Sequence, residues 1–391
     1  MIDRLRTAYA RNNFRNLLNI SFVPKISVLC YIKGGFFIAS FDRFTYHEQL
    51  EIENTQKIRL LLTDLPPYIK DFFRGRELST STKTRLSYSY DFKVFFTFLI
   101  QNNPAWKNRR IQDISLSDLD QLTLSDFEEF QEYLKVYTDP ATSTLIKNSA
   151  GGIARKISTV RSLFTYLYRH DMISRNEPSK VEMPKIAEKD IIRLEPDEVA
   201  ELLDYVESCG ATLTPHRQKY YKKTVARDLA ILTLLLGTGL RVSECVGLNF
   251  DDVDFKNDGV RVTRKGGKEM TVYFGDEVHD ALENYLTIRD EIQEVPGHER
   301  AFFLSMQRKR ISVDAVENLV KKYAKVVAPA KHITVHKLRS TYGSTLYAET
   351  NDIYLVADVL GHNDVNTTKR HYAALSEEHR KSARNRVVLR E

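Results

Sequence analysis

Five residues with side chains suited to phosphoryl transfer follow one another in the C-terminal half of the chain. They are Arg241, His336, Arg339, His362 and Tyr372. An arginine guanidinium is always charged and offers a planar fork that can bind two phosphate oxygens. A histidine that titrates near neutrality can donate a hydrogen bond or take a proton, and a tyrosine hydroxyl can act as a nucleophile. The set therefore contains the groups needed to break a phosphodiester bond without a metal ion.

Two lysines stand between the first arginine and the first histidine. Lys265 and Lys268 enclose a Gly-Gly pair, and the residues on either side, 259–262 and 271–274, alternate between apolar and polar. This alternation around a Gly-Gly turn predicts a β-hairpin, with the lysines at its tip.

The order and spacing of these elements resemble the active-site pattern of tyrosine recombinases of the phage integrase type. The resemblance covers residues 196–375 and rests on the whole ordered set, because His-x-x-Arg or Leu-Gly-His alone arises often by chance. It implies an enzyme that acts on double-stranded DNA recombination sites and needs no metal and no cofactor. It also implies a homotetramer on DNA, with a monomer as the form free in solution, and gives no indication of accessory factors.

The resemblance assigns a role to each catalytic residue. Tyr372 would attack the scissile phosphate and form a 3′-phosphotyrosyl link, while His336 takes its proton. Arg241 and Arg339 would clamp the phosphate, and His362 would donate a hydrogen bond to it. Loss of one such preorganised donor typically lowers the rate on the order of 100- to 1,000-fold.

The resemblance also places the hairpin lysines and the strand exchange. Lys265 matches the family lysine that protonates the leaving 5′ oxygen, and Lys268 is the reserve candidate and an expected DNA contact. A 5′ hydroxyl of a partner strand would then attack the phosphotyrosine, and two such exchanges would pass through a Holliday junction. The polar, basic tail 376–391 is similar to the segment that docks on a neighbouring subunit.

Each residue also has a plain structural explanation when it is taken alone. Arg241 could pair with Glu244 on a helix surface, an interaction worth only a few tenths of a kcal/mol. The histidines could be core residues, Tyr372 is one of 20 tyrosines, and Lys265 could be the solvated edge of a turn. Two departures from the family pattern stand beside these: Lys337 replaces a common acidic residue, and Tyr372 lies ten residues after His362.

Several functions compete within and outside the family. Integration and excision of a mobile element is the expected role, and Xer-type resolution of chromosome or plasmid dimers is the alternative. A type IB topoisomerase would use nearly the same reaction, and a DNA-binding protein without catalysis is the alternative of another class. The presence of every expected reactive group favours an active recombinase.

The elements that position these residues predict a mainly α protein with a small β-hairpin or sheet. Residues 1–62 form a basic leader of unclear role, which could be an accessory DNA-binding unit. Residues 63–175 are expected to form a helical core-site DNA-binding domain, and 176–194, with two prolines and no periodicity, a linker. The remaining 195–391 would form a mixed, mostly α catalytic domain with the docking tail.

A helix near the end of the helical domain carries the expected DNA contacts outside the hairpin. Ile157, Val160, Phe164, Leu167 and Tyr168 fall at the spacing of one apolar stripe. Basic residues lie off this stripe, and those predicted to contact DNA are Arg155, Lys156 and Arg161.

Composition and charge limit the class of protein. The chain has 391 residues, 42% hydrophobic and 28% charged, with a net charge of +6. Residues 301–340 hold nine Lys or Arg against two acidic residues, which suits a surface that faces phosphates. The three cysteines show neither disulfide nor metal-ligand spacing, and no apolar stretch is long enough to span a membrane. A cytoplasmic protein is expected.

Overall fold

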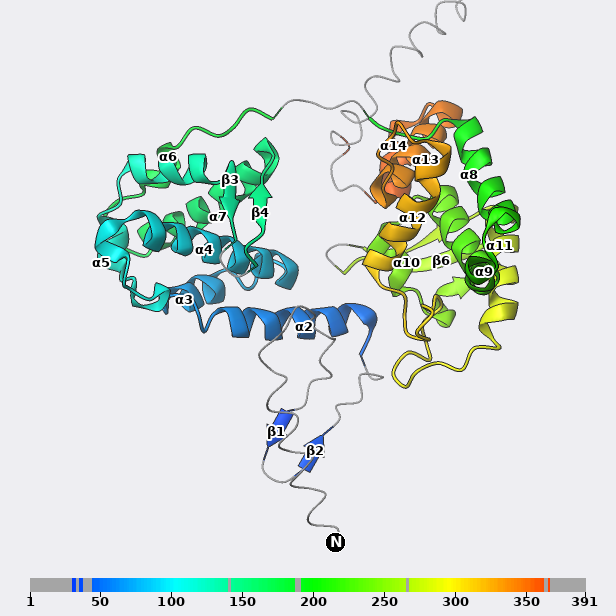
Figure 1. Cartoon of the computed structure of the whole chain (residues 1–391), viewed down its shortest axis with the longest axis horizontal. Coiled ribbons are helices and arrows are strands. Elements are labelled where there is room, and N and C mark those ends of the chain that lie inside the picture. Colours follow the sequence, from blue (N-terminus) through cyan, green and yellow to red (C-terminus); the bar gives the residue numbers. More distant parts are fainter. Residues whose placement is uncertain are drawn as a thin grey trace, which may run out of the picture. The chain divides into compact units, whose positions relative to one another are not determined.

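The fold is described from a computed structural model, shown in Figure 1. It describes residues 30–32, 35–37, 44–139, 142–186, 191–264, 267–361 and 365. In these residues no helix is both long and apolar enough to cross a membrane. Helices dominate, and short antiparallel sheets accompany them, which confirms the predicted fold class.

A short hairpin precedes the helices and is described by itself. Strand β1 (Cys30–Ile32) pairs antiparallel with β2 (Gly35–Phe37), with Tyr31 opposite Phe36. These residues belong to a separate unit of the chain that ends at Phe44.

The helical domain is held together by an aromatic core. Phe95 of one helix meets Phe127 and Phe164 from two others, and these three residues, with Phe92 and Phe96 of the first helix, are at most 1% exposed. Large rings dominate this core because each removes a large apolar area from water. The elements of the domain are α2 (Tyr46–Leu61), α3 (Tyr68–Gly75), α4 (Thr82–Asn102), η2 (Pro104–Trp106), η3 (Ile111–Asp113), α5 (Leu116–Asp120), α6 (Leu124–Tyr133), β3 (Val136–Thr138), β4 (Leu145–Lys147), α7 (Ala150–Arg169) and η4 (Glu177–Lys180).

Helix α7 follows the apolar stripe that the sequence predicts. It begins after Ser149, whose hydroxyl accepts a hydrogen bond from the amide of Gly152 at 3.3 Å, as an N-cap serine does. Ile157, Val160 and Leu167 are buried on its inner face. Tyr168, which the sequence analysis placed on the same stripe, is 50% exposed, so the buried stripe ends at Leu167.

The catalytic domain has its own core around helix α9. Ile231, Leu232 and Leu234 of α9 are fully buried there. An antiparallel sheet of order β5-β6-β7 lies beside the helices, with Val260 opposite Val272. The elements are α8 (Pro196–Ser208), η5 (Cys209–Thr212), α9 (Pro215–Thr238), α10 (Val242–Gly247), η6 (Phe250–Asp252), β5 (Val253–Asp254), β6 (Gly259–Thr263), β7 (Glu269–Tyr273), α11 (Asp276–Arg289), α12 (Val313–Val327), α13 (Val335–Thr350) and α14 (Ile353–Leu360).

The predicted hairpin over residues 259–274 is confirmed by strands β6 and β7. The predicted stop of α9 is confirmed as well: the helix ends at Thr238, and Gly239 adopts φ +63, the left-handed conformation that glycine tolerates best. A side chain at Gly239 would also meet Tyr342, so glycine is required there for space as well as for conformation.

Packing does not follow the expected domain limits in every place. Helix α2 falls within residues 1–62, yet its Ile58 is buried in the core of the helical domain. Within the expected linker 176–194, Val181 joins the helical core and Leu194 joins the catalytic core. The ordered helical packing therefore begins before residue 63, and the domain limits as a whole stay predictions.

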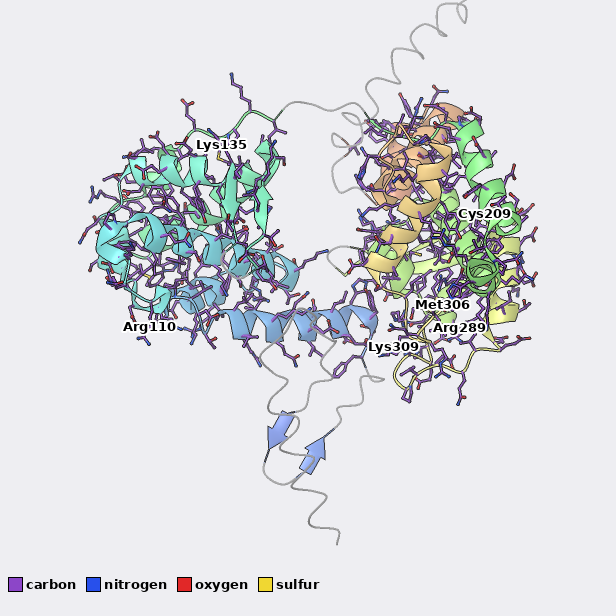
Figure 2. All side chains as sticks on the ribbon, in the orientation of Figure 1. Arg110, Lys135, Cys209, Arg289, Met306 and Lys309 are labelled. Carbon is purple, nitrogen blue, oxygen red and sulfur yellow. The ribbon has the colours of Figure 1, made fainter. Side chains whose placement is uncertain are left out.

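Arg289 is a buried charge of the catalytic domain that has a carboxylate partner. Arg289, labelled in Figure 2, is 1% exposed, and its guanidinium lies 4.9 Å from the ring centre of Phe250. It also forms an ion pair of 2.6 Å with Glu294 and donates to the carbonyl of Ala301 at 3.1 Å. Such pairing is what makes a buried guanidinium tolerable.

Candidate active site

Arg241 is positioned by the break between α9 and α10. It is the N-cap residue of α10, and its amide donates to Oε2 of Glu244 at 2.8 Å. Its Nη1 donates to Oε1 of the same carboxylate at 2.8 Å, and its Nη2 donates to the carbonyl of Gly361 at 3.2 Å. The Arg241 side chain is 35% exposed and that of Glu244 only 3%. The guanidinium of Arg241 is therefore held by hydrogen bonds, while its side chain remains partly exposed to solvent.

The pairing of Arg241 with Glu244 agrees in part with its plain structural explanation. The two residues do interact three positions apart, as the sequence analysis foresaw. Glu244 is buried, however, so this is no surface pair.

Arg339 lies in the second turn of α13 and is 4% exposed. Its Nη1 donates to the carbonyl of Gly239 at 2.5 Å, and its Nη2 donates to the carbonyl of Leu360. Gly239 stands two residues before Arg241, so Arg339 contacts the segment that presents the other arginine.

The two arginines meet at the C-terminal end of α14. Arg339 donates to Leu360 and Arg241 to Gly361, which are consecutive residues. Carbonyls at a helix C-terminus have no partner within the helix and carry partial negative charge, so they attract cations. Gly361 has φ +62 and closes the helix. The structure thus brings together both residues predicted to clamp one phosphate, although they are distant in sequence.

A third arginine, Arg264, joins the same cluster and was not among the predicted site residues. It is 6% exposed, and its Nη1 donates to both carboxylate oxygens of Glu244, at 3.2 and 3.0 Å. A signal was present, because Val260 and Val262 of β6 point inward and the alternation of a strand puts residue 264 on the same face. Burial lowers the pKa of Arg264, and the Glu244 carboxylate opposes this effect.

His336 lies on α13, the helix that also carries Arg339. It is the second residue of that helix, exposed to solvent, and three positions before Arg339, so the two side chains lie on one face. Its carbonyl accepts a hydrogen bond from the hydroxyl of Ser340 at 3.1 Å. The residue is therefore accessible to a substrate on the side of the helix that carries Arg339.

Three predicted catalytic residues, Lys265, His362 and Tyr372, lie outside the described residues, as does the tail 376–391. Their neighbours are described. Arg264 precedes Lys265, and Gly361 precedes His362. Lys268 is exposed, and its carbonyl accepts from the amide of Arg264 at 2.7 Å, which closes the hairpin turn.

The predicted DNA contacts of α7 have different surroundings. Arg155 keeps 48% of its side chain exposed while it pairs with Asp91 and donates to Ser87 at 2.7 Å. Lys156 is 9% exposed and donates to Oδ1 of Asn148 at 2.9 Å. Arg161 is half-buried and donates to two carbonyls, that of Pro178 at 2.8 Å and that of Val181. Arg155 is therefore the best placed of the three to reach a ligand.

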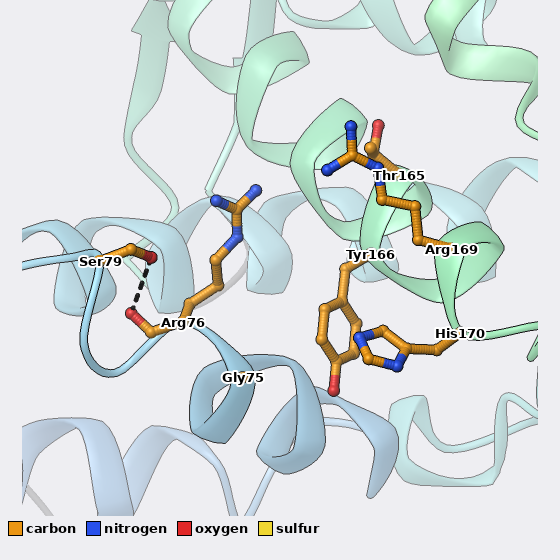
Figure 3. Close-up of a pocket in the computed structure, with 7 residues that line it drawn as sticks. All are labelled: Gly75, Arg76, Ser79, Thr165, Tyr166, Arg169 and His170. Atoms are coloured by element: carbon orange, nitrogen blue, oxygen red, sulfur yellow. Dashed lines mark hydrogen bonds between the residues drawn. The ribbon is translucent and has the colours of Figure 1, made fainter.

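A basic pocket in the helical domain holds none of the predicted site residues. It opens between the end of α3 and the last turn of α7, and its lining includes Arg76, Arg169 and His170 (Figure 3). Arg76 donates to the hydroxyl of Ser162 at 2.8 Å, and the ring centre of His170 lies 4.3 Å from that of Tyr166. The positive side chains make this a second place on the chain that suits anions.

Comparisons with known proteins agree with the geometry. The model of the phage integrase family matches residues 192–379. A tyrosine recombinase XerS of Lactococcus lactis subsp. cremoris is 33% identical over 352 residues, which are 85% of this chain and 97% of that protein. A tyrosine recombinase XerC of Caldanaerobacter subterraneus subsp. tengcongensis is 34% identical, over 78% of this chain and 82% of that protein.

Solved structures share the fold at lower identity. The integrase of the Tn1549 transposon, in complex with transposon right end DNA, superposes with a TM-score of 0.56 at 18% identity, over 81% of this chain and 98% of that one. XerH recombinase bound to its palindromic difH substrate gives a TM-score of 0.54, also at 18% identity, over 77% and 79% of the two chains.

Proposed function

Because the chain belongs to the phage integrase family of tyrosine recombinases and is a site-specific DNA recombinase, we propose that it cleaves and rejoins DNA through Tyr372. One observation above all supports this proposal: Arg241 and Arg339 are held at consecutive carbonyls, those of Gly361 and Leu360. Two guanidiniums fixed at one place can bind the non-bridging oxygens of one phosphate.

In the proposed cleavage step one P–O bond forms as another breaks. The Oη of Tyr372 attacks phosphorus, His336 accepts the phenolic proton, and the bond to the 5′ oxygen breaks as Lys265 supplies a proton to that oxygen. Arg241 and Arg339 stabilise the charge that develops on the phosphorane, and His362 donates a further hydrogen bond. A guanidinium has five N–H donors, so the bonds of Arg241 to Glu244 and Gly361 leave donors for a phosphate.

Rejoining reverses these steps with a new strand. The 5′ hydroxyl of a partner strand attacks the 3′-phosphotyrosine, Tyr372 leaves, and two rounds of exchange resolve a Holliday junction. Four copies of the chain would act on two DNA duplexes in the cytoplasm, and the tail 376–391 would dock on a neighbouring copy. Exposed Arg155 and Lys268, with the basic pocket at Arg76 and Arg169, support a DNA partner.

Covalent trapping tests the chemistry. Purified protein would be mixed with labelled nicked duplexes taken from the DNA that flanks its own gene and run on denaturing gels. We expect a protein–DNA adduct that Tyr372→Phe abolishes. Tyr354→Phe is a matched control, since Tyr354 is 71% exposed on α14. An adduct that survives Tyr372→Phe would refute the assignment of the nucleophile.

The biological role has two candidates. We propose integration and excision of a mobile element, which the fold shared with a transposon integrase supports. Xer-type resolution of chromosome or plasmid dimers is favoured by the curated relatives, which are named XerS and XerC. Sequencing the DNA attached to trapped protein in cells would separate the two. Sites at both ends of a segment that excises as a circle indicate the first role; one site on a chromosome or plasmid that accumulates dimers after deletion of the gene indicates the second.

A further inference from the structure

The side chain of Arg264 contacts groups that lie outside its own hairpin. Besides its bonds to Glu244, its Nη2 donates to the carbonyl of Val359 at 2.9 Å and its Nη1 to that of Leu360 at 3.3 Å. Its guanidinium also lies against Gly361, where an added Cβ would come within 3.0 Å of Nε. One side chain thus spans from β6 to the end of α14.

Two of the groups that Arg264 contacts also serve the arginine pair. Glu244 orients Arg241, and Leu360 accepts from Arg339. Arg264 therefore shares acceptors with both residues that are proposed to clamp the phosphate.

Arg264 is also the residue at which the turn that contains Lys265 begins. Its amide donates to the carbonyl of Lys268 at 2.7 Å, and its carbonyl accepts from the amide of Gly267 at 3.0 Å. The backbone of Arg264 thus closes the turn from both sides, while its side chain is anchored in the arginine cluster. Gly267 has φ +82, which gives the turn its left-handed residue.

We propose that Arg264 is a positioning residue, which fixes the base of the β6–β7 turn to the arginine cluster so that Lys265 is directed at the leaving 5′ oxygen. The inference rests on the proposed function, in which Lys265 donates its proton to that oxygen as the P–O bond breaks. Arg264 itself need not touch the substrate.

A change of leaving group tests this inference. A duplex in which sulfur replaces the bridging 5′ oxygen at the cut site has a leaving thiolate, which departs without an acid because a thiol is far more acidic than an alcohol. The measurement is the single-turnover rate of adduct formation on the sulfur substrate divided by that on the oxygen substrate. This ratio does not depend on how much of the protein is folded.

Arg264→Met is the main variant, and Arg264→Lys keeps the charge but loses the fork. For Arg264→Met we expect a rate on the oxygen substrate lower on the order of 100-fold and near-normal cleavage of the sulfur substrate, with a smaller change for Arg264→Lys. Arg261→Met is the matched control, because Arg261 lies on β6, which Arg264 follows, is exposed and pairs with Asp252 at 3.3 Å. Its ratio should equal that of the wild type.

The outcomes separate this inference from the proposed function. If Lys265→Ala raises the ratio and Arg264→Met does not, Lys265 is the acid and the positioning role of Arg264 is wrong. If Lys265→Ala leaves the ratio unchanged, the acid has been misassigned and the inference fails with it; Lys268→Ala then shows whether the reserve lysine is the acid. If both variants raise the ratio, the inference holds.

Discussion

Arg241 and Arg264 donate to the same carboxylate, that of Glu244, from two different elements of the catalytic domain. Arg241 begins α10, and Arg264 follows β6. One buried negative charge therefore stands between two positive ones and sets the distance between a helix and a hairpin. Glu244 thus holds Arg241, one of the two arginines proposed to clamp the phosphate, together with Arg264 at the base of the hairpin turn.

Replacement of Glu244 should be costly. Glu244→Gln removes the charge and offers one acceptor atom in place of two, so two guanidiniums lose their counter-ion inside the protein. We expect the free energy of unfolding to fall by about 3 to 5 kcal/mol, measured by urea denaturation. Glu317→Gln is the control, since Glu317 is exposed and lies 3.9 Å from Lys321; it should change stability by less than about 1 kcal/mol. Equal losses of stability in Glu244→Gln and Glu317→Gln would mean that the carboxylate of Glu244 stabilises the fold no more than an exposed one.

Gly239 is needed for both conformation and space. An added Cβ would lie 2.5 Å from Cδ1 of Tyr342 and 2.9 Å from Cδ2 of Leu360. Gly239→Ala should lower the melting temperature and the rate of adduct formation, because it strains the backbone by about 1 to 2 kcal/mol and displaces the carbonyl that holds Arg339. Gly267→Ala has positive φ as well but meets nothing within 4 Å, so it should show the strain alone. A smaller loss of stability at Gly239 than at Gly267 would contradict this account.

Arg155 and Arg161 should behave differently on DNA. Arg155 is exposed enough to contact a phosphate, so Arg155→Met is expected to weaken binding and to reduce the slope of log affinity against log salt concentration by about one. Arg161 donates to two carbonyls of the segment after α7, so Arg161→Met should lower stability and leave the slope unchanged. DNA-binding titrations at several salt concentrations check both. A change of slope for Arg161 alone would reverse the assignment.

A histidine–aspartate pair makes stability depend on pH. Nδ1 of His279 lies 2.6 Å from Oδ1 of Asp258, and this hydrogen bond raises the pKa of His279. A raised pKa in the folded state means that the contribution is fully present below the ordinary pKa of about 6.5 and is lost as the pH rises through the folded value. His279→Gln should therefore lower the urea midpoint more at pH 6 than at pH 8.5. Asp258→Asn should remove the pH dependence of stability that this pair causes. If that pH dependence persists in Asp258→Asn, it belongs to other groups.

The sequence could predict what depends on local spacing. His336 and Arg339 share a helix face because they are three residues apart, and the hairpin over residues 259–274 follows from alternation around two glycines. The apolar stripe of α7 was readable for the same reason, as far as Leu167. Residue type and order were enough to predict which chemistry these side chains can perform.

The sequence does not indicate which distant segments contact one another. The bond of Arg264 to Leu360 joins residues 96 positions apart, and nothing near Arg264 in the sequence marks its partner. Arg161 looked like an outward-facing basic residue, because its carbonyl partners lie beyond the end of its helix. Helix α2 was set apart with the leader because Ile58 is one buried residue among many polar ones.

The shared carboxylate also constrains how this site can evolve. Loss of Glu244 leaves buried Arg264 and half-buried Arg241 without their carboxylate, and loss of Arg264 leaves that carboxylate to Arg241 alone. The effects of substitutions at positions 241, 244 and 264 are therefore not additive, because the three residues share one set of contacts. A lineage that alters one of these residues changes the effect of later substitutions at the other two.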